Sequence, residues 1–88
     1  MSVRIDLQAF LSHGVPASVE VEGKTVGECL EVLIERFPQM KKILFQRKGT
    51  LNGYIEIFVN GATPYPDNLM CQVKDGDVVT ALTVLGGG

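Results

Sequence analysis

The 88-residue chain is poor in the groups that usually carry chemistry: it has no tryptophan, one histidine and two cysteines. His13, Cys29 and Cys71 do not make a metal site, because no Cys-x-x-Cys pair and no Cys/His pair at ligand spacing occurs. No apolar run approaches the roughly 18 residues of a membrane span, and the N-terminus lacks a signal peptide's continuous apolar segment. We therefore expect a cytoplasmic protein that is not an enzyme by itself.

Excess positive charge is also missing. Eight Lys and Arg stand against ten Asp and Glu, which gives a net charge of -2 and a pI near 5.2. The one basic cluster comprises Lys41, Lys42, Arg47 and Lys48, and a single aromatic residue, Phe45, is not enough for an interleaved aromatic platform. We expect no nucleic-acid partner. The cluster is interpreted as a solvated surface, with a patch for an acidic protein as the alternative.

The first third of the chain predicts a hairpin of strands followed by a helix. Residues 3–10 begin with a strict alternation of apolar and polar side chains, and the same period returns around Val19 and Val21. Thr25 and Glu28 then form a capping box. Apolar residues recur at helical spacing from Val26 to Phe37, and Pro38 ends the helix. A shorter helical turn is expected at residues 40–44.

The second half predicts strands again. Residues 54–59 alternate with period two, and the following Asn60-Gly61 pair is a hairpin-turn signal that predicts a short strand near Ala62 and Thr63. Another turn at residues 74–77 precedes the most apolar strand, residues 78–85. This order predicts an α+β domain over residues 1–85 with the β-grasp fold, a mixed sheet of about five strands with one main helix across one face. The first and last strands should lie parallel in its middle.

One face of this sheet has no helix left to cover it. If Ile55, Ile57, Val79 and Ala81 point toward the helix, then Phe58 and Leu82 point outward, with Val78 and Val84 near them. Exposed apolar residues on one face usually form a partner surface, so we interpret these residues as a docking site. The alternative is a register shifted by one residue, which would bury Leu82.

The remaining candidate side chains have ordinary structural interpretations. Cys29 falls in the apolar stripe of the helix, whereas Cys71 falls in a loop-like stretch where it could be exposed. His13 beside Gly14 is interpreted as a loop residue. Glu31 and Glu35 are interpreted as a solvated helix face.

The chain ends in three glycines, Gly86, Gly87 and Gly88. Glycine has the most backbone freedom to lose, so this segment is expected to be a flexible tail. The tail could be a frayed end or a remnant without function. Alternatively, it could carry the terminal carboxylate into a channel too narrow for Cβ atoms.

The IEIFVNG segment, the KDGD turn, the apolar last strand and the terminal Gly-Gly together resemble the MoaD/ThiS sulfur carriers, which are ubiquitin-like proteins. The resemblance covers nearly the whole chain and is strongest from Tyr54 to Gly88. A third glycine, Gly86, stands where relatives often carry another small residue.

The resemblance implies that the chemistry takes place on the Gly88 carboxylate. An E1-like adenylyltransferase would bind ATP with Mg²⁺, take Gly86 and Gly87 into its channel and adenylate Gly88. Sulfur from a persulfide would then displace AMP and leave a thiocarboxylate. The acceptor would be a synthase, such as the large subunit of molybdopterin synthase or an equivalent enzyme, and the chain would use no permanently bound cofactor.

Several functions remain open at this point. The first hypothesis is sulfur donation in molybdopterin biosynthesis, and related carriers serve cysteine or thiamine-thiazole synthesis. From other classes, the chain could be a protein modifier conjugated through Gly88, or a β-grasp interaction module whose tail has no chemistry. Pathway, sulfur donor and oligomeric state are not specified by the residues.

Overall fold

A computed structural model describes residues 2–47 and 49–84 of the chain. Its elements are, in order, β1 (Val3–Asp6), the 3-10 helix η1 (Gln8–His13), β2 (Ser18–Val21), α1 (Val26–Arg36), α2 (Met40–Leu44), β3 (Phe45–Arg47), β4 (Thr50–Leu51), β5 (Ile55–Val59) and β6 (Val78–Thr83). Within the described ranges, no helix is long and apolar enough to cross a membrane.

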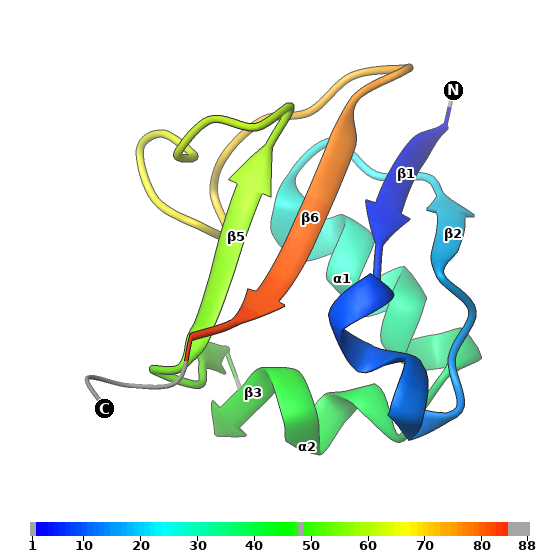
Figure 1. The fold of residues 1–88 in the computed structure, drawn as a ribbon. Coiled ribbons are helices and arrows are strands. Elements are labelled where there is room, and N and C mark those ends of the chain that lie inside the picture. The colour runs from blue at the N-terminus through cyan, green and yellow to red at the C-terminus, as the bar shows by residue number, and fades with distance from the viewer. Residues whose placement is uncertain (1, 48, 85–88) are drawn as a thin grey trace.

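The main sheet has four strands in the order β2-β1-β6-β5 (Figure 1). β1 pairs with β2 and β5 pairs with β6 in antiparallel fashion, while β1 and β6 run parallel in the middle. The apolar last strand thus occupies the interior of the sheet, as predicted. A separate two-stranded sheet of β3 and β4 lies beside α2 (Figure 1). The fold is the predicted α+β β-grasp arrangement.

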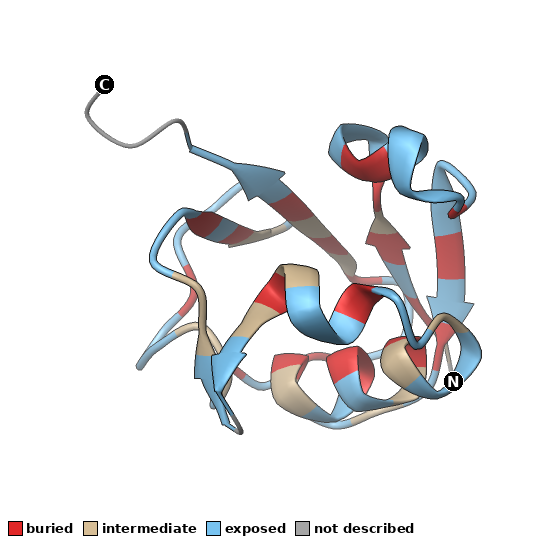
Figure 2. Cartoon of the chain, turned by 90° about the horizontal axis from the view of Figure 1, so that it is seen from below, coloured by how far each residue is buried: buried red, intermediate tan, exposed pale blue. Residues whose placement is uncertain are grey.

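The core fills the space between α1 and one face of the sheet. The inward side chains of the central strands are almost completely buried, with Ile5 and Val79 both at 0% exposure and Ile57 at 1%. On α1 the buried stripe consists of Val26, Cys29, Leu30 and Leu33. Figure 2 shows these buried segments facing inward, while the opposite sides of the helices are exposed. The predicted helical stripe is therefore confirmed.

Both ends of α1 follow from local sequence chemistry. The Glu28 N–H donates to the Thr25 hydroxyl at 3.1 Å, and the Glu28 carboxylate reaches back to accept from the Lys24 N–H at 2.7 Å. The helix ends at Arg36, shortly before Pro38, whose ring disfavours helical geometry in the preceding residue. The capping box and the proline stop are both confirmed.

The first strand is shorter than the period-two pattern predicts. β1 ends at Asp6 because the side chain of this residue accepts a hydrogen bond from the Gln8 N–H at 3.0 Å. The Phe10 N–H then donates to the Leu7 carbonyl at 2.8 Å and continues the chain as a 3-10 helix. An aspartate that bonds its own backbone two residues on favours a turn over an extended strand.

The strand count of the second half also needs correction. Val59 and Ala62 exchange two backbone hydrogen bonds around the Asn60-Gly61 turn, but only an isolated bridge follows and not a strand. Pro64 has no N–H and does not donate to a ladder, so the pairing stops. The main sheet consequently has four strands and not about five, whereas β3 and β4 were not predicted at all.

Candidate functional site

The predicted docking residues lie together on the uncovered face of β5 and β6. Leu82 pairs with Glu56, and the register places Leu82 diagonally between Tyr54 and Phe58. The Val84 N–H donates to the Tyr54 carbonyl at 2.7 Å, which continues the pairing beyond β6. We call the four apolar residues of this face, Tyr54, Phe58, Leu82 and Val84, the outer patch.

Exposure decides the register question. Leu82 is 39% exposed, Tyr54 48% and Val84 45%, and Phe58 is half-buried. On the inner face, Ile55 at 4% and Ala81 at 1% are buried. The predicted orientation of both faces is therefore confirmed, and the alternative register that would bury Leu82 is wrong. Tyr54 was not named as a docking residue, although the same period-two pattern places it beside Phe58.

The outer patch stops where the sheet continues into β1 and β2. There the same face carries Arg4 paired with Glu20, and Asp6 paired with Ser18. Arg4 neighbours Val78 and Asp6 neighbours Thr80 across the parallel pair. The uncovered face therefore has a charged half on β1 and β2 and a half on β5 and β6 that carries the outer patch together with the exposed Glu56. β6 runs along the boundary toward its exit from the sheet at Val84.

A polar cluster fixes the opposite end of β5 and β6. The Asn60 side-chain amide donates to Asp77 Oδ1 at 3.0 Å, and the Lys74 N–H donates to Asp77 Oδ2 at 2.9 Å. Asn60 Oδ1 accepts in turn from the Val78 N–H at 2.9 Å. These bonds stabilise the charged carboxylate and lower the pKa of Asp77, with the Asn60 bond as the largest cause.

This cluster gives the two most recognisable motifs a structural role. Asn60 belongs to IEIFVNG and Asp77 to KDGD, and together they connect the end of β5 with the start of β6. The two strands are separated by residues 60–77 and therefore lack a tight hairpin to set their register. The Asn60–Asp77 contact instead joins the two strands at this end, next to the Val59–Val79 pair where their register begins.

The other candidate side chains are not placed for chemistry. Cys29 is fully buried, and burial raises the pKa of its thiol, so a reactive thiolate is disfavoured. His13 was expected in a loop but is the last residue of η1, where it is exposed. Glu31 and Glu35 are exposed on α1, as predicted. Lys48 lies outside the described residues. Among residues 2–47 and 49–84, no group of His, Cys, Asp and Glu could hold a metal ion.

The expectation for Cys71 is wrong. Its side chain is buried, at 9% exposure, because the segment around it packs against the first turn of α1. The Val26 N–H donates to the Cys71 carbonyl at 3.0 Å, and the Gly27 N–H donates to the Leu69 carbonyl at 2.9 Å. Long-range bonds of this kind leave no signal in a single sequence.

The predicted tail residues Gly86, Gly87 and Gly88 lie outside the described part of the chain, as does Leu85. Val84 is therefore the last residue whose contacts are known. It belongs to the outer patch and is held to the start of β5, so the sequence that precedes the tail is anchored beside the patch.

Comparison with known proteins agrees with this architecture. No family model matches the chain. It is 28% identical over 89 residues to a "Putative sulfur carrier protein" of Archaeoglobus fulgidus, with all of both chains covered. Among solved structures, the chain superimposes on CysO in the crystal structure of the Amycolatopsis orientalis BexX/CysO complex. The TM-score is 0.78 and the identity 27%, over 98% of this chain and 99% of that one.

SAMP1 of Haloferax volcanii, a small archaeal modifier protein, superimposes with a TM-score of 0.82 over the whole of both chains at 22% identity, which supports the fold. The chain is thus similar in sequence and fold to small ubiquitin-like proteins of the MoaD/ThiS type. The proteins it resembles are small carriers and modifiers, and one of them, CysO, was crystallised together with another protein, BexX.

Proposed function

We propose that the chain is a sulfur carrier whose reactive group is the Gly88 carboxylate. In this proposal an E1-like adenylyltransferase binds the outer patch and uses ATP with Mg²⁺. A carboxylate oxygen of Gly88 attacks the α-phosphate and releases pyrophosphate. Sulfur delivered at the oxidation level of sulfide then displaces AMP, so that a thiocarboxylate remains.

The observation that supports this proposal most strongly is the position of the outer patch at the end of β6. An apolar face of Tyr54, Phe58, Leu82 and Val84 lies next to the last anchored residue, after which Leu85 and three glycines follow in the sequence. Four residues span at most about 14 Å when extended. A partner that binds the outer patch would therefore have its reaction centre within that distance of Val84.

The composition fits a co-substrate better than a catalyst. The described residues offer neither a metal cluster nor a reactive thiol, and the proposed chemistry needs none, because the partner can supply Mg²⁺, base and electrostatic stabilisation. Glycines at the end of the chain lack Cβ atoms and fit a narrow channel. Both cysteines are free thiols, as is usual in the cytoplasm, where we place the protein.

For the acceptor we propose the large subunit of molybdopterin synthase, with this chain as the corresponding small subunit. A cysteine-type acceptor is the second candidate, and it is favoured by the likeness to CysO at 27% identity. Conjugation to lysines of other proteins is the third candidate function, suggested by the fold shared with SAMP1.

Mass spectrometry of the chain and of other proteins from its native cells distinguishes a carrier from a modifier. A carrier shows one C-terminal oxygen replaced by sulfur, and a modifier shows glycine remnants on target lysines.

Deletion of Gly88 tests the proposal directly. We expect the truncated chain to lose ATP–pyrophosphate exchange with its E1-like enzyme, because the carboxylate no longer reaches the nucleotide. Its free energy of unfolding should change by less than about 0.5 kcal/mol, as for other changes away from the core. Gly53→Ala is a matched control, since nothing lies within 4 Å of a Cβ at this position and exchange should be kept. Full exchange by the truncated chain would refute the carrier function.

A further inference from the structure

A groove on the helix side of the molecule is not used by the proposed chemistry. It lies between α1 and the α2–β3 segment, has a volume of about 960 Å³ and reaches to Met70. A smaller hollow of about 310 Å³ adjoins it between β4 and residues 67–69, and both share Gly49 and Leu69. We call the larger space the helix-side groove.

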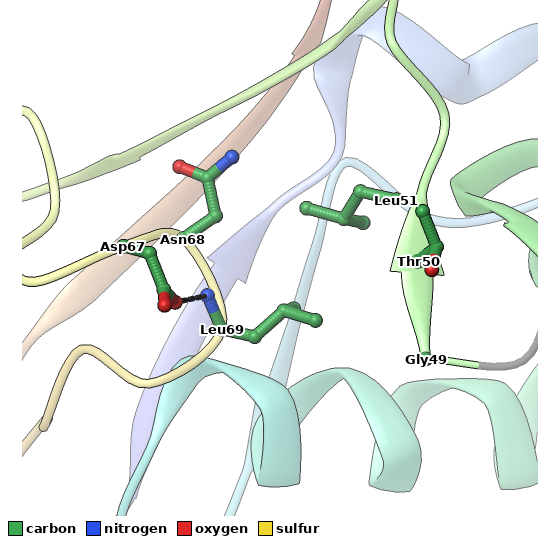
Figure 3. A pocket seen from close by; sticks show the side chains of 6 residues that line it. All are labelled: Gly49, Thr50, Leu51, Asp67, Asn68 and Leu69. Atoms are coloured by element: carbon green, nitrogen blue, oxygen red, sulfur yellow. Dashed lines mark hydrogen bonds between the residues drawn. The ribbon is translucent and has the colours of Figure 1, made fainter.

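The groove has an apolar floor. Ile34 of α1, Phe45 of β3 and Leu69 are half-buried, and Met70 at its edge is 63% exposed. In the adjoining hollow, Leu51 and Leu69 extend into the space between β4 and residues 67–69, above α1 (Figure 3). Apolar side chains of α1, of the β3–β4 hairpin and of residues 69–70 therefore line the two adjoining spaces.

Hydrogen bonds hold the wall beside α1 in place. Asp67 Oδ1 accepts from the Leu69 N–H at 2.9 Å, drawn in Figure 3, and from the Met70 N–H at 2.8 Å. The Leu69 carbonyl accepts from the Gly27 N–H, and a Cβ at Gly27 would come within 3.2 Å of that carbonyl oxygen. The absence of a side chain at Gly27 thus allows the close approach of this loop to the helix.

The opposite wall is held by Asn52. Its side-chain amide donates to the Ile43 carbonyl at 2.8 Å, and its N–H donates to the Leu44 carbonyl at 2.8 Å. These contacts connect the end of β4 to the last turn of α2. Because both walls are fixed in the free chain, a ligand of the groove would not have to order them, which lowers the cost of binding.

The two sides of the groove carry opposite charges. Glu31 and Glu35 are exposed along α1 on one side, and Lys41, Lys42 and Arg47 are exposed on the other side. The apolar floor lies between these rows. This arrangement is complementary to a segment that carries an apolar row with basic residues on one flank and acidic residues on the other.

We propose that the helix-side groove binds such an amphipathic segment of a second protein partner, with its basic flank toward α1 and its acidic flank toward α2 and β3. The groove is built on the helices and the β3–β4 hairpin, whereas the outer patch is built on the opposite, uncovered face of the sheet. One partner can therefore hold the carrier by its helix side while the outer patch and the tail serve another.

A peptide selection tests this proposal without knowledge of the natural partner. The probe is a library of random 16-residue peptides displayed on phage, selected on the full chain and depleted on the Met70→Glu variant. We expect enriched peptides with an apolar row and both kinds of charge, which bind the wild-type chain at least tenfold more tightly than the variant. Their amide shift changes in ¹⁵N spectra should fall on α1, β3 and residues 67–70.

A second test of the proposal reverses the charges along α1. Glu31→Lys combined with Glu35→Lys should weaken an enriched peptide at least tenfold, and exchange of the peptide's basic residues for acidic ones should restore the affinity. A purely structural role of the two glutamates would not be rescued in this way. ATP–pyrophosphate exchange should stay unchanged in all these variants, so failure of this proposal is distinguishable from failure of the carrier function.

Three results would overturn the proposal. The selection could yield no peptide that distinguishes wild type from Met70→Glu, or only peptides whose shifts map to Tyr54 and Leu82. Affinity could be indifferent to the charge reversal. Finally, sedimentation equilibrium could show self-association of the chain that Met70→Glu abolishes, which would assign the groove to a second copy of the same protein.

Discussion

Both faces of β5 and β6 carry large apolar side chains, although the outer face also holds Glu56, and the two faces differ in what covers them. On the inner face Ile57 is 1% exposed beneath α1, whereas on the outer face Leu82, one strand away, is 39% exposed. The hydrophobicity of a strand therefore does not say which of its residues stabilise the fold. Which residues stabilise the fold depends on which face of the sheet is covered by helices, because a sheet with one helix layer buries one face only.

The largest effect is expected from a charge on the inner face. Ile57→Asp places an unpaired carboxylate in the core beneath α1 and should lower the free energy of unfolding by about 4 kcal/mol or more, enough to unfold a domain of this size. Urea unfolding followed by circular dichroism measures it. Ile57→Val, which removes one methylene group, should cost only about 0.5–1.5 kcal/mol.

The same charge on the outer face should leave the fold intact. We expect Leu82→Asp to change the free energy of unfolding by less than about 1 kcal/mol, because the side chain is already partly in water. Binding of the activating enzyme, measured by calorimetry, should weaken by more than about 1 kcal/mol, as for a truncated interface anchor. If Leu82→Asp unfolded the chain and Ile57→Asp did not, the two faces would be assigned the wrong way round.

Loss of the polar cluster at the end of the strands should have an intermediate effect. In Asp77→Asn one of the two accepting oxygens becomes a donor, which should cost about 1–2 kcal/mol of stability at neutral pH. The variant tests whether the Asn60–Asp77 contact sets the register of the outer patch. If it does, the amide shifts of Leu82 and Phe58 should move although neither touches Asp77.

The cost of Asp77→Asn should also depend on pH. Because the pKa of Asp77 is lower in the folded than in the unfolded chain, its carboxylate contributes stability that is complete above the ordinary pKa of about 3.9 and is lost as the pH falls through the folded value. Unfolding curves of wild type and variant should therefore converge as the pH falls below the folded pKa of Asp77. Equal differences at acidic and neutral pH would contradict this role of the charge.

The smallest effect is expected on the charged half of the outer face. The Glu20 side chain points to solvent, since its contact with Arg36 is made by its backbone carbonyl at 2.7 Å. Glu20→Ala should change stability by less than about 0.5 kcal/mol and leave binding of the activating enzyme unaltered. A loss of affinity similar to that of Leu82→Asp would extend the docking surface over β1 and β2.

The features predicted from sequence depend on local periodicity. The alternation around Ile57 and Phe58 assigned both faces of β5, and the capping box at Thr25 located the start of α1. Both patterns are carried by residues within a few positions of one another. Leu82 and Val84 were placed by the same reasoning, because a period of two admits only two orientations and just one of them buries Ile57.

The features that were missed depend on contacts between distant segments or on competing side-chain bonds. The carboxylate of Asp6 ends β1 through a bond that an alternation pattern does not contain. Cys71 is buried because its loop is bonded to α1, and the groove combines Ile34, Phe45 and Met70 from three parts of the chain. The β3–β4 hairpin has strands of three and two residues, too short for periodicity to show.

The parallel pairing of β1 and β6 has a mechanical consequence. The chain enters the sheet at one end of this pair and leaves it at the other, and β6 is hydrogen-bonded on both sides. A pull on the C-terminal end, with the N-terminal end held, would slide β6 along β1 and load all the bonds between them at once. Antiparallel neighbours would instead separate bond by bond from one end. We therefore expect the parallel pair to resist a pull along β6 more strongly than an antiparallel pair would.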